Sequence, residues 1–185
     1  EIDARVRNGH QGSLSVWSAG CSTGQELYSI GMVLESIRQQ EVPVLDWYGI
    51  GTDISFDAVN RSQRALYGES AVESIPEQYR DRFTIESGGG SWQVSESIRS
   101  RTHFFQSNLL HVNSAPFSDF DIIFCQNVLI YFEHETQLWI INQLAERLSP
   151  GGLLILGAGE DAWWKNPLMH RQSWPGVCAY RKLEV

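Results

Sequence analysis

The chain has little cysteine and no long hydrophobic run. Its three cysteines, Cys21, Cys125 and Cys178, form no C-x-x-C pair and have no histidine at metal-ligand spacing. We therefore expect neither a disulfide framework nor a bound metal, and a reducing cytoplasm is the expected location. No apolar run approaches the ~20 residues that a membrane-spanning helix needs, so no membrane insertion is expected.

Basic residues are also scarce. The 185 residues include 14 Lys and Arg against 22 Asp and Glu, which gives a net charge of −8. Non-specific binding of nucleic acid depends on Lys and Arg neutralising phosphates, so this balance argues against a nucleic-acid partner but not against a cationic ligand. The chain starts at Glu1 without a basic and apolar leader, so we expect no secretory signal and interpret the sequence as a fragment.

The sequence does contain alternating strand and helix patterns. Residues 13–19 mix β-branched, aromatic and small side chains and stop at Gly20, which predicts a strand and a tight turn. Apolar residues then recur at three- and four-residue steps over 25–40, as on one face of a helix. This alternation predicts an α/β, Rossmann-like fold with a mostly parallel sheet and helices on both faces. Further strands are expected at 47–54, 120–126, 153–157 and, at an edge, 176–182, and further helices at 55–68 and 135–148.

One segment departs from this alternation. Two short extended runs, 82–86 and 92–96, flank three consecutive glycines, and 103–106 is again extended. Alternating runs around a glycine turn are typical of an antiparallel hairpin. We therefore expect one domain over 1–185 with a small β insertion at about 82–106.

Polar or glycine residues stand where the predicted parallel strands end. Parallel sheets bind ligands beyond the carboxyl ends of their strands, so these residues are candidates for one site. The turn from Gly20 to Gly24 lacks the G-x-G-x-x-G of dinucleotide sites and the lysine of a phosphate loop. Glu26 follows it, and an acid there suits a cofactor with an ammonium and a sulfonium, although the glycines alone require only a tight turn. The strand ends are Gly20, Asp53, Asn108, Asn127 and Gly157.

The acids among these candidates have alternative roles. Ser22 or Thr23 are predicted to cap the first helix, and Glu26 either completes a capping box with Thr23 or meets the amino-acid end of the cofactor. Asp53 either accepts hydrogen bonds from ribose hydroxyls or caps the next helix, a role that Ser55 can also fill.

The amides have alternatives too. Asn108 and Asn127 either fix turns or, with Leu109 and Val128 behind them, bracket an adenine ring. Tyr131, just beyond, either faces the same site or packs as an ordinary aromatic side chain.

These residues resemble the CheR-type chemotaxis methyltransferases. Residues 17–30 look like that family's W-S-A-x-x-S-T-G-E-E-P-Y-S-I signature. The later motifs match in order, and the resemblance extends from about 16 to 180. They are Thr52-Asp53-Ile54, Asn108-Leu109-Leu110, residues 124–132 (FCQNVLIYF) and Leu148-Ser149-Pro150-Gly151-Gly152.

The resemblance implies a class I methyltransferase that uses S-adenosyl-L-methionine and releases S-adenosyl-L-homocysteine. Its expected partner is the cytoplasmic domain of a chemoreceptor, whose glutamates it would esterify. The small β insertion looks like the subdomain that docks a receptor tail in some members, and from the resemblance we expect the family's N-terminal helical domain to be absent from these 185 residues. Tyr131 is expected to face the methyl group, and a functional arginine matches Arg7 or Arg5. The implied cofactor-binding residues are Gly20, Glu26, Asp53, Asn108, Leu109, Asn127 and Val128.

Several positions depart from the family pattern. Gln25 replaces an acid, Leu27 a proline and Gln126 an arginine, and residues 157–160 read Gly-Ala-Gly-Glu instead of G-H-S-E. These changes bear on the substrate more than on the cofactor. The alternative hypothesis is a non-catalytic module that binds the same cofactor and signals through its partners, and a nicotinamide dehydrogenase is the least favoured because the G-x-G-x-x-G motif is absent.

Overall fold

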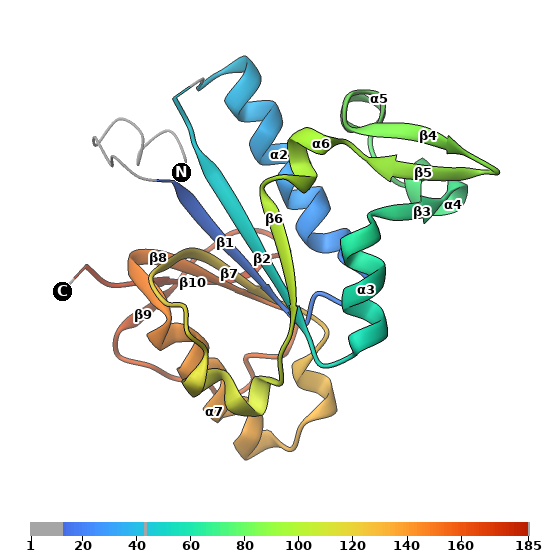
Figure 1. Ribbon diagram of the computed structural model, residues 1–185. Coiled ribbons are helices and arrows are strands. Elements are labelled where there is room, and N and C mark those ends of the chain that lie inside the picture. The colour runs from blue at the N-terminus through green and yellow to red at the C-terminus, as the bar shows by residue number, and fades with distance from the viewer. Residues whose placement is uncertain (1–12, 43, 185) are drawn as a thin grey trace.

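The computed structural model describes residues 13–42 and 44–184, and a seven-stranded sheet runs through them (Figure 1). Its strand order is β6-β2-β1-β7-β8-β10-β9. The first five strands are parallel, whereas β10 and β9 are antiparallel to their neighbours. The strands are β1 Leu14–Ala19, β2 Trp47–Asp53, β6 Thr102–Gln106, β7 Phe120–Cys125, β8 Leu148–Leu156, β9 Met169–Arg171 and β10 Cys178–Lys182.

Both faces of this sheet are covered, and β1 shows why. Leu14 and Val16 belong to the apolar cluster beneath α2 (Gln25–Gln40), whereas Trp17 and Ala19 belong to the cluster beneath α7 (His134–Glu146). Successive side chains of a strand point to opposite faces, so a strand covered on both sides is apolar throughout. The predicted Rossmann-like fold is confirmed. The remaining helices are α3 Phe56–Arg64, α4 Glu69–Glu73, α5 Glu77–Phe83 and α6 Glu96–Arg99, with 3₁₀ turns η1 Leu109–Ser114 and η2 Leu129–Tyr131.

A second, three-stranded antiparallel sheet stands beside α3, away from the main sheet (Figure 1). The predicted glycine-turn hairpin is present as β4 (Thr84–Gly88) and β5 (Ser91–Val94). A third strand, β3 (Leu66–Gly68), pairs with the other side of β5. The small sheet therefore spans 66–94, while the extended residues 102–106 pair with β2 in the main sheet instead of continuing the insertion.

Three predicted boundaries are wrong. Gly24, in a left-handed conformation with φ of +86°, is the N-cap of α2, and no side chain caps that helix. Helix α3 ends at Arg64, with Ala65 as its C-cap, instead of at Gly68, because residues 66–68 leave the helix to pair with β5. Strand β10 is not an edge strand, because β9 pairs along its outer side.

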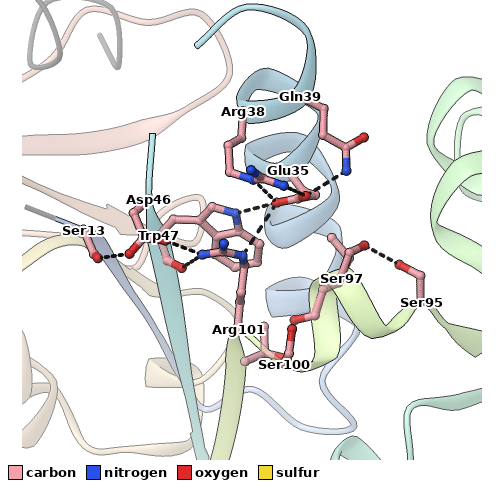
Figure 2. A network of polar contacts seen from close by, with 12 residues as sticks. Ser13, Glu35, Arg38, Gln39, Asp46, Trp47, Ser95, Ser97, Ser100 and Arg101 are labelled. Atoms are coloured by element: carbon pink, nitrogen blue, oxygen red, sulfur yellow. Dashed lines mark hydrogen bonds and ion pairs between the residues drawn. The ribbon is translucent and has the colours of Figure 1, made fainter. Parts of the chain in front are cut away.

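A buried carboxylate joins α2 to the start of β2 (Figure 2). Glu35 is fully buried and accepts hydrogen bonds from Arg38 Nε at 2.8 Å, Gln39 Nε2 at 2.7 Å and Trp47 Nε1 at 3.1 Å. Arg101, in the connection between α6 and β6, lies 3.8 Å from the same carboxylate and also pairs with Asp46. This network fastens the helix that follows the Gly20 turn to the sheet at its far end.

Candidate cofactor site

A cavity of about 490 Å³ opens where four parallel strands end. This volume lies within the range of about 300–1,000 Å³ typical of small-molecule sites. The residues that follow β1, β2, β6 and β7 converge on it. Its lining comprises Gly20, Ser22, Thr52, Asp53, Ile54, Ser107, Asn108, Leu109, Leu110, Gln126, Asn127, Val128, Tyr131 and Phe132.

The turn after β1 forms one wall of this cavity. The backbone N–H groups of Gly20 and Cys21 both donate to the Thr52 carbonyl, at 2.8 and 2.9 Å, which closes the turn against β2. Gly20 has φ of +84°, and a Cβ built there would lie 2.3 Å from Val128 Cγ2. Glycine is therefore required here for close approach of two cavity-lining loops as well as for a tight turn.

Asp53 ends β2 and lines the cavity. Its Oδ2 accepts from the Ser22 N–H at 2.8 Å and its Oδ1 from the Ser55 N–H at 2.9 Å. Ser55 itself caps α3, accepting from the Ala58 N–H at 3.2 Å, so Asp53 is not the helix cap. An ionised carboxylate has about four acceptor sites, and two of those on Asp53 remain for a ligand's hydroxyl groups.

The two asparagines line the cavity from different strands: Asn108 follows β6 and Asn127 follows β7. Asn108 Oδ1 accepts from the Leu110 N–H at 2.9 Å and caps η1, so its carbonyl fixes a turn while its NH₂ group remains a donor. Asn127 has φ of +58°, a left-handed conformation that asparagine tolerates better than most residues. Leu109 and Val128 are half-buried beside them and give the cavity apolar walls suited to a flat ring.

Tyr131 follows at the end of η2, and 80% of its surface is exposed although it lines the cavity. This exposure rules out ordinary core packing, the alternative role for this side chain. Arg7 and Arg5, the candidates for the family arginine, lie outside the described residues.

Glu26 is placed differently from the other candidates. It is half-buried in the first turn of α2 but is not among the cavity-lining residues. Its Oε1 accepts from Ser18 Oγ at 2.7 Å, and Thr23 Oγ1 donates to Gln25 Oε1 instead of capping the helix, so the capping box is wrong. Burial raises the pKa of Glu26 above its usual value, and the hydrogen bond from Ser18 offsets only part of this increase.

One buried acid near the cavity was missed from the sequence. Glu160 is 7% exposed, and its carboxylate accepts backbone N–H bonds from Gly157, Asn127 and Leu129 at 2.8–3.1 Å. The signal in the sequence was that Glu160 stands where the family's G-H-S-E motif has its acid, but this match does not reveal contacts about 30 residues upstream.

The charge of the cavity limits what it can bind. Among the described residues that line it, Asp53 is the single carboxylate, and neither lysine nor arginine is present. Such a lining disfavours phosphate and suits a ligand that has hydroxyl groups, a flat ring and positive charge.

Comparison with known proteins identifies that ligand. The family model of the CheR methyltransferase, SAM binding domain, matches residues 2–173. The chain belongs to this family. It is therefore an S-adenosylmethionine-binding domain, and the residues present fit that cofactor. The Asp53 carboxylate suits the ribose hydroxyls, Leu109 and Val128 suit the adenine, and the absence of a basic residue among the described lining suits the sulfonium.

Curated relatives cover most of this chain. It is 35% identical over 158 residues to the chemotaxis protein methyltransferase Cher2 of Pseudomonas putida, covering 84% of this chain and 57% of the relative. It is 36% identical over 156 residues to chemotaxis protein methyltransferase 1 of Pseudomonas aeruginosa, covering 83% and 56%. The chain thus spans little more than half the length of these relatives. A solved glycopeptide N-methyltransferase, MtfA with bound S-adenosylmethionine, is 16% identical over 98% of this chain and 64% of its own, with a TM-score of 0.49.

Proposed function

We propose that the protein containing this domain transfers a methyl group from S-adenosylmethionine to glutamate side chains of chemoreceptors. The products would be a glutamate methyl ester and S-adenosylhomocysteine. The observation that carries the proposal is the convergence of Asp53, Asn108 and Asn127 on one cavity with the exposed Tyr131 at its side. The names of the relatives, chemotaxis protein methyltransferases, support a chemotaxis substrate, and we propose that the reaction takes place in the cytoplasm.

The proposed reaction makes few demands on the protein. A glutamate side chain, with a pKa near 4.3, is already an anionic nucleophile at neutral pH, so no general base is required. When bound, the cofactor supplies an activated methyl group whose C–S bond breaks as the new O–C bond forms. The domain then has to hold the two reactants in line and exclude water. Asp53 and the two amides would fix the cofactor, Tyr131 would face the methyl group, and Arg7 would complete the site.

Calorimetry of the full-length protein with S-adenosylhomocysteine tests the cofactor role of these residues. We expect micromolar binding that is lost in Asp53→Ala, because the ribose hydroxyls lose their acceptor. Asp57→Ala is the matched control, since this exposed acid on α3 carries the same charge away from the cavity. Equal affinity in the two variants would contradict the role of Asp53.

Transfer of tritiated methyl groups to receptor cytoplasmic fragments tests the substrate. A methyl ester is base-labile, so we expect label that is released by mild alkali. Cofactor binding without any transfer to receptor fragments would favour the alternative of a non-catalytic, cofactor-binding signalling module.

A further inference from the structure

The loop that follows β7 carries four cavity-lining residues and has little regular structure of its own. Residues 126–131 leave the sheet, turn at Asn127 and end in the short η2. Asn127, Val128 and Tyr131 all reach the cavity from this loop. A loop that presents several ligand-facing groups needs a rigid support to hold them in place.

A single carboxylate supplies that support. Glu160 Oε2 accepts from the Asn127 N–H at 3.1 Å and the Gly157 N–H at 2.8 Å, and Oε1 accepts from the Leu129 N–H at 2.9 Å and the Ile130 N–H at 3.4 Å. Three of these four donors belong to the loop. The fourth, on Gly157, ties the same carboxylate to the end of β8.

Gly157 makes this arrangement possible. A Cβ built on Gly157 would lie 2.3 Å from Glu160 Oε2 and 3.0 Å from the Asn127 nitrogen. Any larger residue at 157 would therefore push the carboxylate or the loop away. The glycine, the acid and the loop form one unit that connects the ends of β7 and β8.

We infer that Glu160 is a positioning residue of the cofactor site, which holds Asn127, Val128 and Tyr131 in place by accepting the backbone N–H bonds of their loop. The effect of Glu160 on cofactor binding rests on the proposed function, because it requires that the side chains of the loop contact cofactor or substrate. The geometric part of the inference stands independently of that function. Glu160 is not among the residues that line the cavity, so we assign it no part in the chemistry.

The isosteric variant Glu160→Gln tests this role. A glutamine has one acceptor oxygen, so its NH₂ group must face two backbone N–H donors that the carboxylate had satisfied. We expect the amides of Asn127, Leu129 and Ile130 to exchange with deuterium about tenfold faster or more. The Kd for S-adenosylhomocysteine in the full-length protein should rise by about tenfold or more, since each unsatisfied buried donor is costly.

Two controls separate positioning from general destabilisation. Asp161→Asn removes the neighbouring carboxylate, which accepts from Tyr180 Oη at 2.7 Å and lies 3.3 Å from Arg171, and it should leave loop exchange and cofactor affinity unchanged. Gly157→Ala displaces the carboxylate without changing charge and should reproduce Glu160→Gln. Gly68→Ala adds the same methyl at φ of −74° with nothing within 4 Å of it, so it is the matched control for a methyl that displaces nothing.

The outcomes distinguish this inference from the proposed function. If Glu160→Gln or Gly157→Ala leaves the exchange of the loop amides as in the wild type, the positioning role is overturned. If Glu160→Gln does not fold, deuterium exchange of the loop amides in the wild type tests the positioning role instead. Fast exchange of the Leu129 amide would then overturn that role, because Glu160 is its acceptor. If the wild type does not bind S-adenosylhomocysteine, the proposed function fails, while the exchange measurement still decides the role of Glu160.

Discussion

Replacement of Gly20 by alanine should destabilise the domain through backbone strain and a clash with Val128, and the clash should also weaken cofactor binding. The added methyl meets two obstacles. An alanine at φ of +84° occupies the left-handed region, which costs about 1–2 kcal/mol for a residue with a Cβ. The same Cβ would lie 2.3 Å from Val128 Cγ2 and 3.0 Å from Cγ1, and overpacking of this kind costs about 1–3 kcal/mol.

A matched glycine separates these two contributions. Gly176 has φ of +73° but nothing within 4 Å of an added Cβ, so Gly176→Ala carries the strain without the clash. In urea unfolding, Gly20→Ala should lose about 1–3 kcal/mol more of the free energy of unfolding than Gly176→Ala does. Calorimetry should show weaker S-adenosylhomocysteine binding for Gly20→Ala alone, because Val128 must move in the cavity wall.

A double-mutant cycle assigns the clash to Val128. Val128→Ala removes the two nearest atoms and leaves only the Cβ, at 3.2 Å. The double variant Gly20→Ala/Val128→Ala should therefore be more stable than the sum of the single changes predicts, by about 0.5–3 kcal/mol. Additive effects, together with equal stability of Gly20→Ala and Gly176→Ala, would refute the close approach of the two loops.

Three further predictions concern single side chains. Tyr131→Phe should leave the free energy of unfolding within about 0.5 kcal/mol, since the residue is exposed, but should lower the rate of methyl transfer about tenfold in the labelling assay. Burial alone would raise the pKa of Glu35, but hydrogen bonds from Arg38, Gln39 and Trp47 lower it on balance. In acid unfolding, wild-type stability should therefore fall as the pH drops below 4.5, and Glu35→Gln should lack that part of the decline. Burial raises the pKa of Glu26 above its ordinary value of 4.5. Its contribution to the free energy of unfolding is therefore present below pH 4.5 and is lost as the pH rises. Glu26→Gln should accordingly be more stable than the wild type at pH 7 by chemical unfolding and should bind S-adenosylhomocysteine more weakly.

Features determined by neighbouring residues could be predicted from the sequence. The strand, glycine turn and helix over 13–40 follow from patterns that repeat every two or three to four residues. Asp53, Asn108 and Asn127 could be grouped because the ends of parallel strands meet at one edge of a sheet. Ser55 was an identifiable helix cap for the same local reason.

Features that depend on distant partners could not be predicted. Nothing in the five residues of β10 indicates that β9 pairs along its outer side. The support that Glu160 gives the loop comes from backbone donors about 30 positions upstream, and backbone groups leave no mark in a sequence. Glu35 looks like an ordinary polar position on a helix until Trp47 and Arg101 approach it from other elements.

Glu26 brings stability and function into opposition. Burial disfavours its charge, and the hydrogen bond from the Ser18 hydroxyl only partly compensates. A neutral glutamine would avoid that cost and still accept the same hydrogen bond. Burial raises the pKa of the Cys125 thiol at the end of β7, and the negative charges of Glu160 and Glu26 raise it further. Both carboxylates therefore lie close enough to this edge of the sheet to affect the same thiol. Backbone N–H donors satisfy the carboxylate of Glu160, whereas the charge of Glu26 is disfavoured by burial until a cation approaches it, and we expect the ammonium of S-adenosylmethionine to be that cation.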